Sequence, residues 1–186
     1  MFTESQSELQ RIASLNPGAQ ASLTDELQRL ADVAEWTQQF APCTLGVRKV
    51  FLTAQTEAYH HHHHELGTQH LLLGLLDYTK GVSMQVLMHM HVNGQQMRFQ
   101  LEESLKQDAL PGKSIAPLSM YAQEALMHAR NEQERFNHNI LETEHILLGL
   151  LLTEGSQAAN MLIDYGVTIA EAHRHVLQLL GRGGNY

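Results

Sequence analysis

The sequence has little of several features that would mark a particular class of protein. Its 186 residues include one cysteine, Cys43, so no disulfide can form within the chain, as suits a reducing compartment. Twelve basic residues against twenty acidic ones give a net charge of −8, which offers no basic footprint for nucleic acid. No apolar run approaches the roughly 20 residues of a membrane span, and no signal-peptide pattern opens the chain. These absences predict a cytoplasmic protein that binds neither nucleic acid nor membrane.

The residues that are present predict a folded, all-α protein. Hydrophobic residues make up 43% of the chain and charged residues 17%, which is typical of a globular protein and not of a disordered one. The chain is long enough for one domain or two small ones, and no segment has a convincing strand pattern.

The most informative feature is a string that occurs twice. Residues 68–76 read TQHLLLGLL, and residues 143–151 read TEHILLGLL, an offset of 75 residues. The same offset relates His63 to His138 and further residues on both sides of the strings. Matches at one fixed offset over so long a span indicate a tandem repeat.

Each string is predicted to form a buried helix. Thr68 and Thr143 are expected to act as N-caps, since a threonine hydroxyl can accept a hydrogen bond from a first-turn amide. The leucine run that follows is apolar on every side, which a helix tolerates only when protein surrounds it. A buried strand is the competing interpretation, but flanking segments of helical period favour the helix.

The repeat divides the chain into five parts. Residues 1–43 form an N-terminal helical extension, 44–106 the first repeat, 107–118 a linker with Pro and Gly, 119–181 the second repeat, and 182–186 a flexible tail. Four helices are expected in each repeat. The apolar residues at helical spacing in the extension are Leu23, Leu27, Leu30 and Trp36. They are expected to pack on the repeats, or else to form a partner or homodimer interface.

Two histidine features invite a metal interpretation. The run His60–His64 could hold zinc or nickel, yet a run does not make four ligands converge. It also occupies the same length as the corresponding turn of the second repeat, so we interpret it as a solvated turn and keep a metal-binding protein as the alternative. Glu142 and His145 have the Glu-x-x-His spacing of di-iron bundles, but Gly67 replaces the glutamate in the first repeat. We therefore predict no metal and no cofactor, and expect His70 and His145 in the core.

No catalytic motif is complete. Gly112, Lys113 and Ser114 resemble the end of a phosphate-binding loop, but the required upstream glycine and leading strand are missing. Cys43 has no evident histidine partner, and the Gly-x-Ser-x-Gly nucleophile elbow does not occur. The sequence predicts a non-enzyme.

The doubled string, with Ala54, Glu57, Ala58 and His63 ahead of its first copy, resembles the Clp N-terminal repeat over residues 44–181, in its ClpC-type form. The resemblance implies a compact pseudo-twofold domain of two four-helix repeats. In full-length members this domain precedes ATPase modules that unfold proteins for the ClpP peptidase, and it receives adaptors and substrates without catalysis. This chain lacks such modules and carries about forty extra leading residues. The resemblance therefore implies an accessory protein: an adaptor, an assembly factor for the protease, or a decoy that sequesters ligands aimed at the unfoldase. The partners it implies are unfoldase, peptidase, adaptor or substrate proteins.

The resemblance also implies candidate binding residues. Some ClpC-type domains recognise phosphoarginine, and cyclic-peptide antibiotics bind them. The matching positions here are Thr44 with Gln69 in the first repeat and Ser119 with Glu144 in the second. A carboxylate can pair with the guanidinium and a neutral amide cannot supply that charge, so the second pocket is expected to be the stronger. The alternative is that these residues serve only as helix caps and polar surface.

Overall fold

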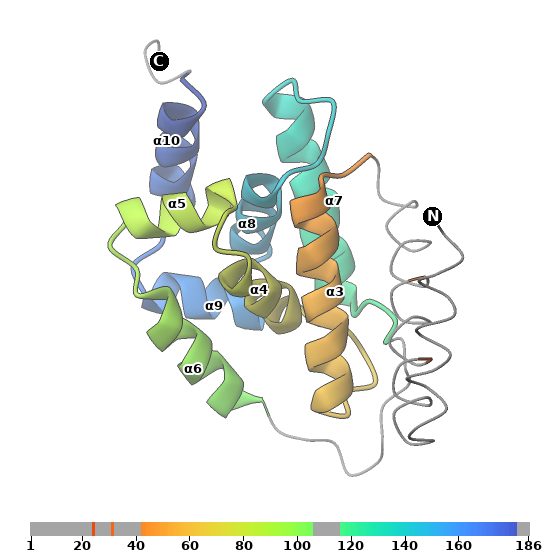
Figure 1. Cartoon of the computed structure of the whole chain (residues 1–186). Helices are drawn as coiled ribbons and strands as arrows, with labels where there is room; N and C mark the ends of the chain where they lie inside the picture. The colour runs from red at the N-terminus through yellow and green to blue at the C-terminus, as the bar shows by residue number, and fades with distance from the viewer. Residues whose placement is uncertain (1–23, 25–30, 32–41, 106–115, 182–186) are drawn as a thin grey trace, which may run out of the picture.

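A computed structural model of the chain describes residues 42–105 and 116–181, together with Thr24 and Ala31 (Figure 1). These residues form eight α-helices and no strand, which confirms the predicted all-α fold. The first four are α3 (Leu45–His60), α4 (Thr68–Asp77), α5 (Val82–His89) and α6 (Gly94–Ser104). The second four are α7 (Met120–Arg135), α8 (Thr143–Leu152), α9 (Gln157–Asp164) and α10 (Ile169–Leu179).

The two sets of helices are copies of one unit. Each helix from α7 to α10 begins and ends 75 residues after its counterpart from α3 to α6. Polar N-caps help to fix these starts: the side chains of Thr44, Ser119, Ser156 and Thr168 each accept a hydrogen bond from a first-turn amide. The repeat predicted from the sequence is therefore a structural repeat as well. The predicted interface residues Leu23, Leu27, Leu30 and Trp36, and the Gly112–Ser114 segment, lie outside the described residues.

Helices α4 and α8 lie at the centre, and the other helices surround them (Figure 1). Their leucines are almost completely buried, which accounts for runs that are apolar on every side. Helix α3 covers α4 with one buried apolar face, formed by Val47, Val50, Phe51, Ala54 and Ala58. Helix α7 covers α8 in the same way.

Two glycines set how closely these helices pack. A Cβ atom at Gly74 would lie 2.3 Å from the carbonyl oxygen of Val50, and one at Gly149 would lie 2.2 Å from that of Ala125. Neither distance is compatible with a real side chain. The glycine of each repeated string is thus required by the contact between the central helix and the first helix of its repeat.

Thr68 and Thr143 do not cap their helices, contrary to the prediction. The N-cap residues are Gly67 and Glu142, and each threonine is the first helical residue. The Thr68 hydroxyl accepts a hydrogen bond from the N–H of Ala158 at 3.3 Å, and Thr143 accepts one from Ser83 at 3.4 Å. The hydroxyls therefore join the two repeats, and each threonine lies one residue past the N-cap of its helix.

None of the described helices is long and apolar enough to cross a membrane alone. Helices α8 and α9 have the composition to do so as a pair, but they meet at an angle of 95°.

Candidate functional site

Two short backbone pairings hold the repeats together and place the predicted site residues. In the first seam, the N–H of Thr44 donates to the carbonyl of Leu141, and the N–H of Leu141 donates to that of Pro42. In the second seam, the N–H of Ser119 donates to Leu66, and the N–H of Leu66 donates to Pro117. Each seam joins the segment before the first helix of one repeat to the segment before the central helix of the other.

The seams group the predicted residues across the repeats. Thr44 is bound to Leu141, three residues before Glu144, and Ser119 is bound to Leu66, three residues before Gln69. The sequence grouping had paired each hydroxyl with the polar residue of its own repeat. Both hydroxyls also act as helix caps, since Thr44 accepts from the Val47 amide and Ser119 from the Ala122 amide. Any ligand pocket built from these residues therefore combines both repeats.

Glu144 and Gln69 occupy equivalent positions but different environments. Glu144 is fully buried, and neither carboxylate oxygen has a hydrogen-bond partner among the described residues, whereas Gln69 is half-buried. The pKa of Glu144 is raised to about 7, mainly by burial; its own backbone N–H opposes this rise, and the nearby Glu142 contributes to it. The side-chain amide of Gln69 occupies the space beside Gly67: a Cβ atom at Gly67 would lie 2.2 Å from Oε1 of Gln69. Because Glu142 has a Cβ, Glu144 cannot follow the same path.

A pair of histidines lies beneath each of these positions. The N–H of Gly67 donates to Nδ1 of His70, so the proton of a neutral His70 ring is on Nε2, which lies 2.7 Å from Nδ1 of His63. His145 repeats this arrangement with Glu142 and His138 at 2.9 Å for both contacts. Each chain of hydrogen bonds runs from a backbone amide through one imidazole to a second.

This arrangement requires both buried rings to be neutral. Burial lowers the pKa of His70 to about 3, with His63 and His61 contributing, and lowers that of His145 to about 4, with His138 contributing. His70 and His145 are completely buried and have backbone partners, which confirms the core role predicted for them.

His138, Glu144 and His145 resemble a metal site by position, because one donor atom from each lies within 4.8 Å of the others. The hydrogen bonds make a poor ligand of His145, however. A metal-bound histidine donates its other N–H to an acceptor, whereas Nδ1 of His145 already accepts from a backbone amide. The cluster is therefore better described as a buried imidazole pair beside an unpartnered carboxylate.

The histidine run is divided by the fold. His60 ends α3 and is exposed, as is His64, while His61, His62 and His63 are half-buried. His63 belongs to the imidazole pair described above. The solvated-turn interpretation therefore holds for the ends of the run and is wrong for His63, whose match to His138 at the repeat offset was the available signal.

A hollow between α7 and α10 is lined by Glu132, Arg135, Phe136, His173 and Leu177. Its buried Glu132 accepts from Arg135 at 2.8 Å and pairs with His173 at 2.5 Å. The first repeat has the equivalent ion pair, Glu57 with Arg98 at 2.9 Å. The acidic group of the hollow is therefore already paired. Its contact with His173 joins α10, the last helix of the repeat, to α7, the first.

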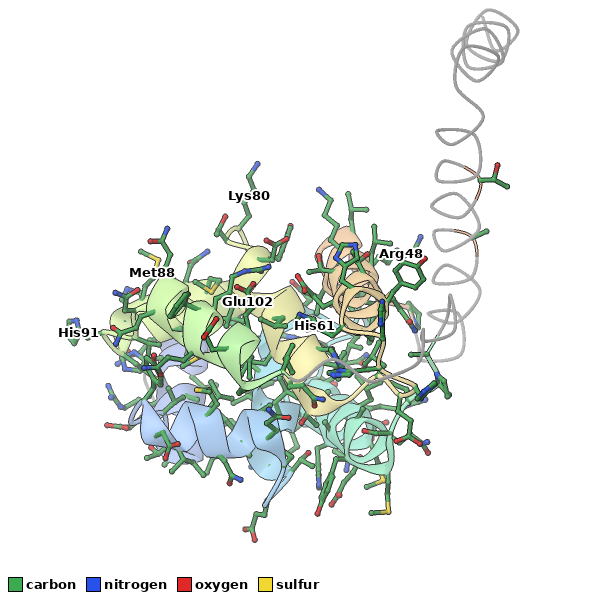
Figure 2. All side chains as sticks on the ribbon, turned by 90° about the horizontal axis from the view of Figure 1, so that it is seen from below. Arg48, His61, Lys80, Met88, His91 and Glu102 are labelled. Atoms are coloured by element: carbon green, nitrogen blue, oxygen red, sulfur yellow. The ribbon has the colours of Figure 1, made fainter. Side chains whose placement is uncertain are left out.

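Exposed apolar side chains recur at the seams. Leu45 and Met120 are the equivalent first residues of α3 and α7, and they are 69% and 74% exposed. Ile140 adjoins the first seam and Tyr121 the second, and both are also exposed. A second equivalent pair of exposed residues, Met88 and Ile163, lies in the last turn of α5 and of α9. Figure 2 shows Met88 beside His91, on the opposite side of the molecule from Arg48. Helical spacing identifies the apolar face of a helix that is buried. It could not identify these residues, because they are single apolar side chains on exposed surfaces.

Comparison with known proteins matches both repeats to one family model and the chain to full-length relatives. The model of the Clp repeat (R) N-terminal domain matches residues 43–114 and 117–185. The chain is 31% identical over 142 residues to the chaperone protein ClpB of Oceanobacillus iheyensis, and 30% identical over 145 residues to the negative regulator of genetic competence ClpC/MecB of Bacillus subtilis. Each match covers 76% of this chain and 17% of the relative, so the chain spans less than a fifth of their length.

Solved structures share the fold. The Hsp104 N-terminal domain from Candida albicans matches with a TM-score of 0.64 at 17% identity, over 76% of this chain and 93% of that one. The ClpV N-domain in complex with a VipB peptide matches with a TM-score of 0.60 at 17% identity, over 77% and 90% of the two chains.

Proposed function

Because the chain belongs to the Clp repeat N-terminal domain family, we propose that it is a non-catalytic module that binds proteins and peptides for a Clp chaperone or protease system. Its partners in this proposal are unfoldase or peptidase components, adaptors and substrates. The ClpV N-domain, which shares the fold, has been solved with a peptide bound. The observation that carries the proposal is the set of exposed apolar side chains at both seams.

The seam surfaces are suited to an amphipathic segment. At the first, Leu45 and Ile140 flank the backbone pairing; at the second, Met120 and Tyr121 follow it. Large apolar side chains exposed beside a rigid backbone pairing are typical anchors for a partner, and methionine adapts to varied surfaces. The net charge of −8 favours a partner segment whose polar face is basic. We therefore assign a basic, amphipathic peptide as the ligand class.

The test is a binding measurement on the intact chain with a labelled peptide that has leucines on one face and lysines and arginines on the other. The double substitution Leu45→Glu and Met120→Glu should weaken binding at least tenfold. The matched control is Met88→Glu with Ile163→Glu, an equally exposed and equivalent pair away from the seams. Equal affinities for both double variants, or equal binding of a scrambled peptide, would reject the seam surfaces as the site.

Phosphoarginine is a second and narrower candidate ligand, favoured by the unpartnered carboxylate of Glu144. Its guanidinium could pair with that group once the side chain reaches the surface. Calorimetric titration with free phosphoarginine should show binding that is lost in Glu144→Ala and kept in Gln69→Ala. Equal responses of both variants and the unsubstituted chain would remove this candidate.

Several biological roles fit a binding module of this kind. We place the protein in the cytoplasm, on the evidence of its single cysteine, and consider an adaptor, an assembly factor and a decoy for cyclic peptides as roles. A homodimer through Leu23, Leu27, Leu30 and Trp36 is the structural alternative. Deleting residues 1–42 and measuring the mass in solution distinguishes it. If the shortened protein has the same number of chains per particle as the intact protein, such a dimer is excluded.

A further inference from the structure

We propose that Glu144 is a proton-controlled gate at the first seam: neutral, its side chain stays buried, and ionised, it moves to the surface. The proposal concerns a conformational device that acts without a ligand. It therefore does not depend on the peptide-binding function.

The first argument is the environment of the carboxylate. Glu144 is fully buried, and neither oxygen has a hydrogen-bond partner among the described residues. An ionised carboxylate in such a place loses its hydration and gains nothing in return, which is among the costliest arrangements in a protein interior. Its position in the first turn of α8 favours the charged form, but this helix-end effect is small beside the loss of hydration.

The second argument is that, among the described residues, no hydrogen bond or ion pair joins the Glu144 carboxylate to the titratable groups near it. His145 donates to His138 and accepts from the Glu142 amide, although both rings are within reach of Glu144. From α7, Glu132 pairs with Arg135 and with His173 of α10. Glu142, the N-cap of α8, is an acid and repels a second negative charge. Ionisation therefore leaves Glu144 two options, which are to reach solvent or to acquire a cation from outside.

The third argument is the comparison between the repeats. The same imidazole pair, seam and central helix recur in the first repeat, but position 69 is a glutamine, which cannot ionise, and it is half-buried over Gly67. The two seams thus differ in one fully buried carboxylate. The pKa of about 7 that burial gives Glu144 sets the midpoint of the gate near neutrality.

Movement of Glu144 would alter the first seam alone. Glu144 lies three residues after Leu141, whose carbonyl accepts a hydrogen bond from the backbone N–H of Thr44. If the seam surface is the docking site proposed above, a cationic side chain of the partner would bind there with release of one proton.

The experiment is a pH titration of the intact chain by NMR, with ¹³C-labelled glutamate carboxyl groups and ¹⁵N-labelled amides. The Glu144 carboxyl signal, identified by its absence in Glu144→Gln, should titrate near pH 7. With the same midpoint, the amides of residues 43–44 and 140–145 should shift and exchange faster with solvent. The amides of residues 66–70 and 119 should not.

Two variants complete the test. Glu144→Gln should keep the low-pH spectrum of the first seam at all pH values, whereas Glu142→Gln, its matched control, should still switch, with a lower midpoint because Glu142 contributes to the raised pKa of Glu144. A Glu144 carboxyl that titrates at the ordinary glutamate value would overturn the proposal. So would titration near neutrality that leaves the amides of the first seam unchanged.

Discussion

Nε2 of His70 lies 2.7 Å from Nδ1 of His63, at the end of a chain of hydrogen bonds that starts at a backbone amide. His145 and His138 repeat the relationship. An additional proton on either ring of a pair would place two donors face to face. The fold therefore binds fewer protons at His70 and His145 than the unfolded chain does.

The first prediction concerns stability in acid. Since folding lowers the pKa of His70 to about 3 and that of His145 to about 4, their contribution is complete above pH 6.5 and is lost as the pH falls. At pH 5 each ring should cost on the order of 2 kcal/mol of unfolding free energy. Glu144 opposes this loss, because its raised pKa favours the folded state below pH 7. Urea unfolding at pH 7 and pH 5 should show a net loss of about 1–2 kcal/mol.

The control for acid stability is His64→Asn, which removes an exposed imidazole and should leave the pH profile unchanged. Equal unfolding free energies at pH 7 and pH 5 would show that the buried rings are not held neutral.

The second prediction isolates Glu144. Glu144→Gln removes the cost of ionising a carboxylate whose pKa is raised by folding, a cost met by moving the side chain to the surface, and at pH 8 it should stabilise the protein by about 1–3 kcal/mol. The variant should also lose more stability than the unsubstituted chain between pH 7 and pH 5, because the opposing contribution of Glu144 is gone. Denaturant titrations at the three pH values measure both effects. Glu142→Gln, at a half-buried position two residues away, should have clearly smaller effects, because Glu142 only contributes to the raised pKa of Glu144.

The third prediction concerns the glycines of the repeated strings. Gly74→Ala and Gly149→Ala should each destabilise the protein by about 1–3 kcal/mol or more, because the new methyl group meets a backbone carbonyl of the neighbouring helix. Gly94→Ala is the matched control. Its Cβ would contact the flexible end of Met84 at 3.0 Å, so helix propensity should make this change neutral or favourable. Thermal unfolding of the three variants decides the matter, and equal effects would refute the close-packing explanation.

The fourth prediction uses a difference between the repeats. His91 follows α5 with a φ of 60°, and its equivalent after α9 is Gly166, with a φ of 77°. His91→Gly should stabilise the protein by about 1 kcal/mol, since glycine tolerates this left-handed conformation. His89→Gly, inside the same helix, should destabilise it by a similar amount. A destabilised His91→Gly protein, measured by denaturant titration, would contradict this explanation.

The sequence predicted the repeat and its helices well because these features depend on local signals. The period of 75 residues, the apolar strings and caps such as Ser119 appear directly in the chain, and α8 has the predicted bounds, Thr143–Leu152. The same string misled the capping prediction. A threonine before a leucine run usually caps it, but here Glu142 is the N-cap of α8, and the Thr143 hydroxyl accepts a hydrogen bond from the N–H of Ser83 in the other repeat.

The site was less predictable because it depends on contacts between the repeats. Nothing local shows that Thr44 is bound to Leu141, nearly a hundred residues away, or that Glu144 is buried while Gln69 is not. The burial of Glu144 follows from the Cβ of Glu142, which a sequence comparison records only as a glycine replaced by a glutamate.

The most direct test of the proposed function is an NMR map of the basic amphipathic peptide on the intact chain. The seam surfaces predict that amide shifts gather around Leu45 and Ile140 at the first seam and around Met120 and Tyr121 at the second. Shifts centred on Met88 and Ile163, or no shifts at a large molar excess of the peptide, would contradict the account.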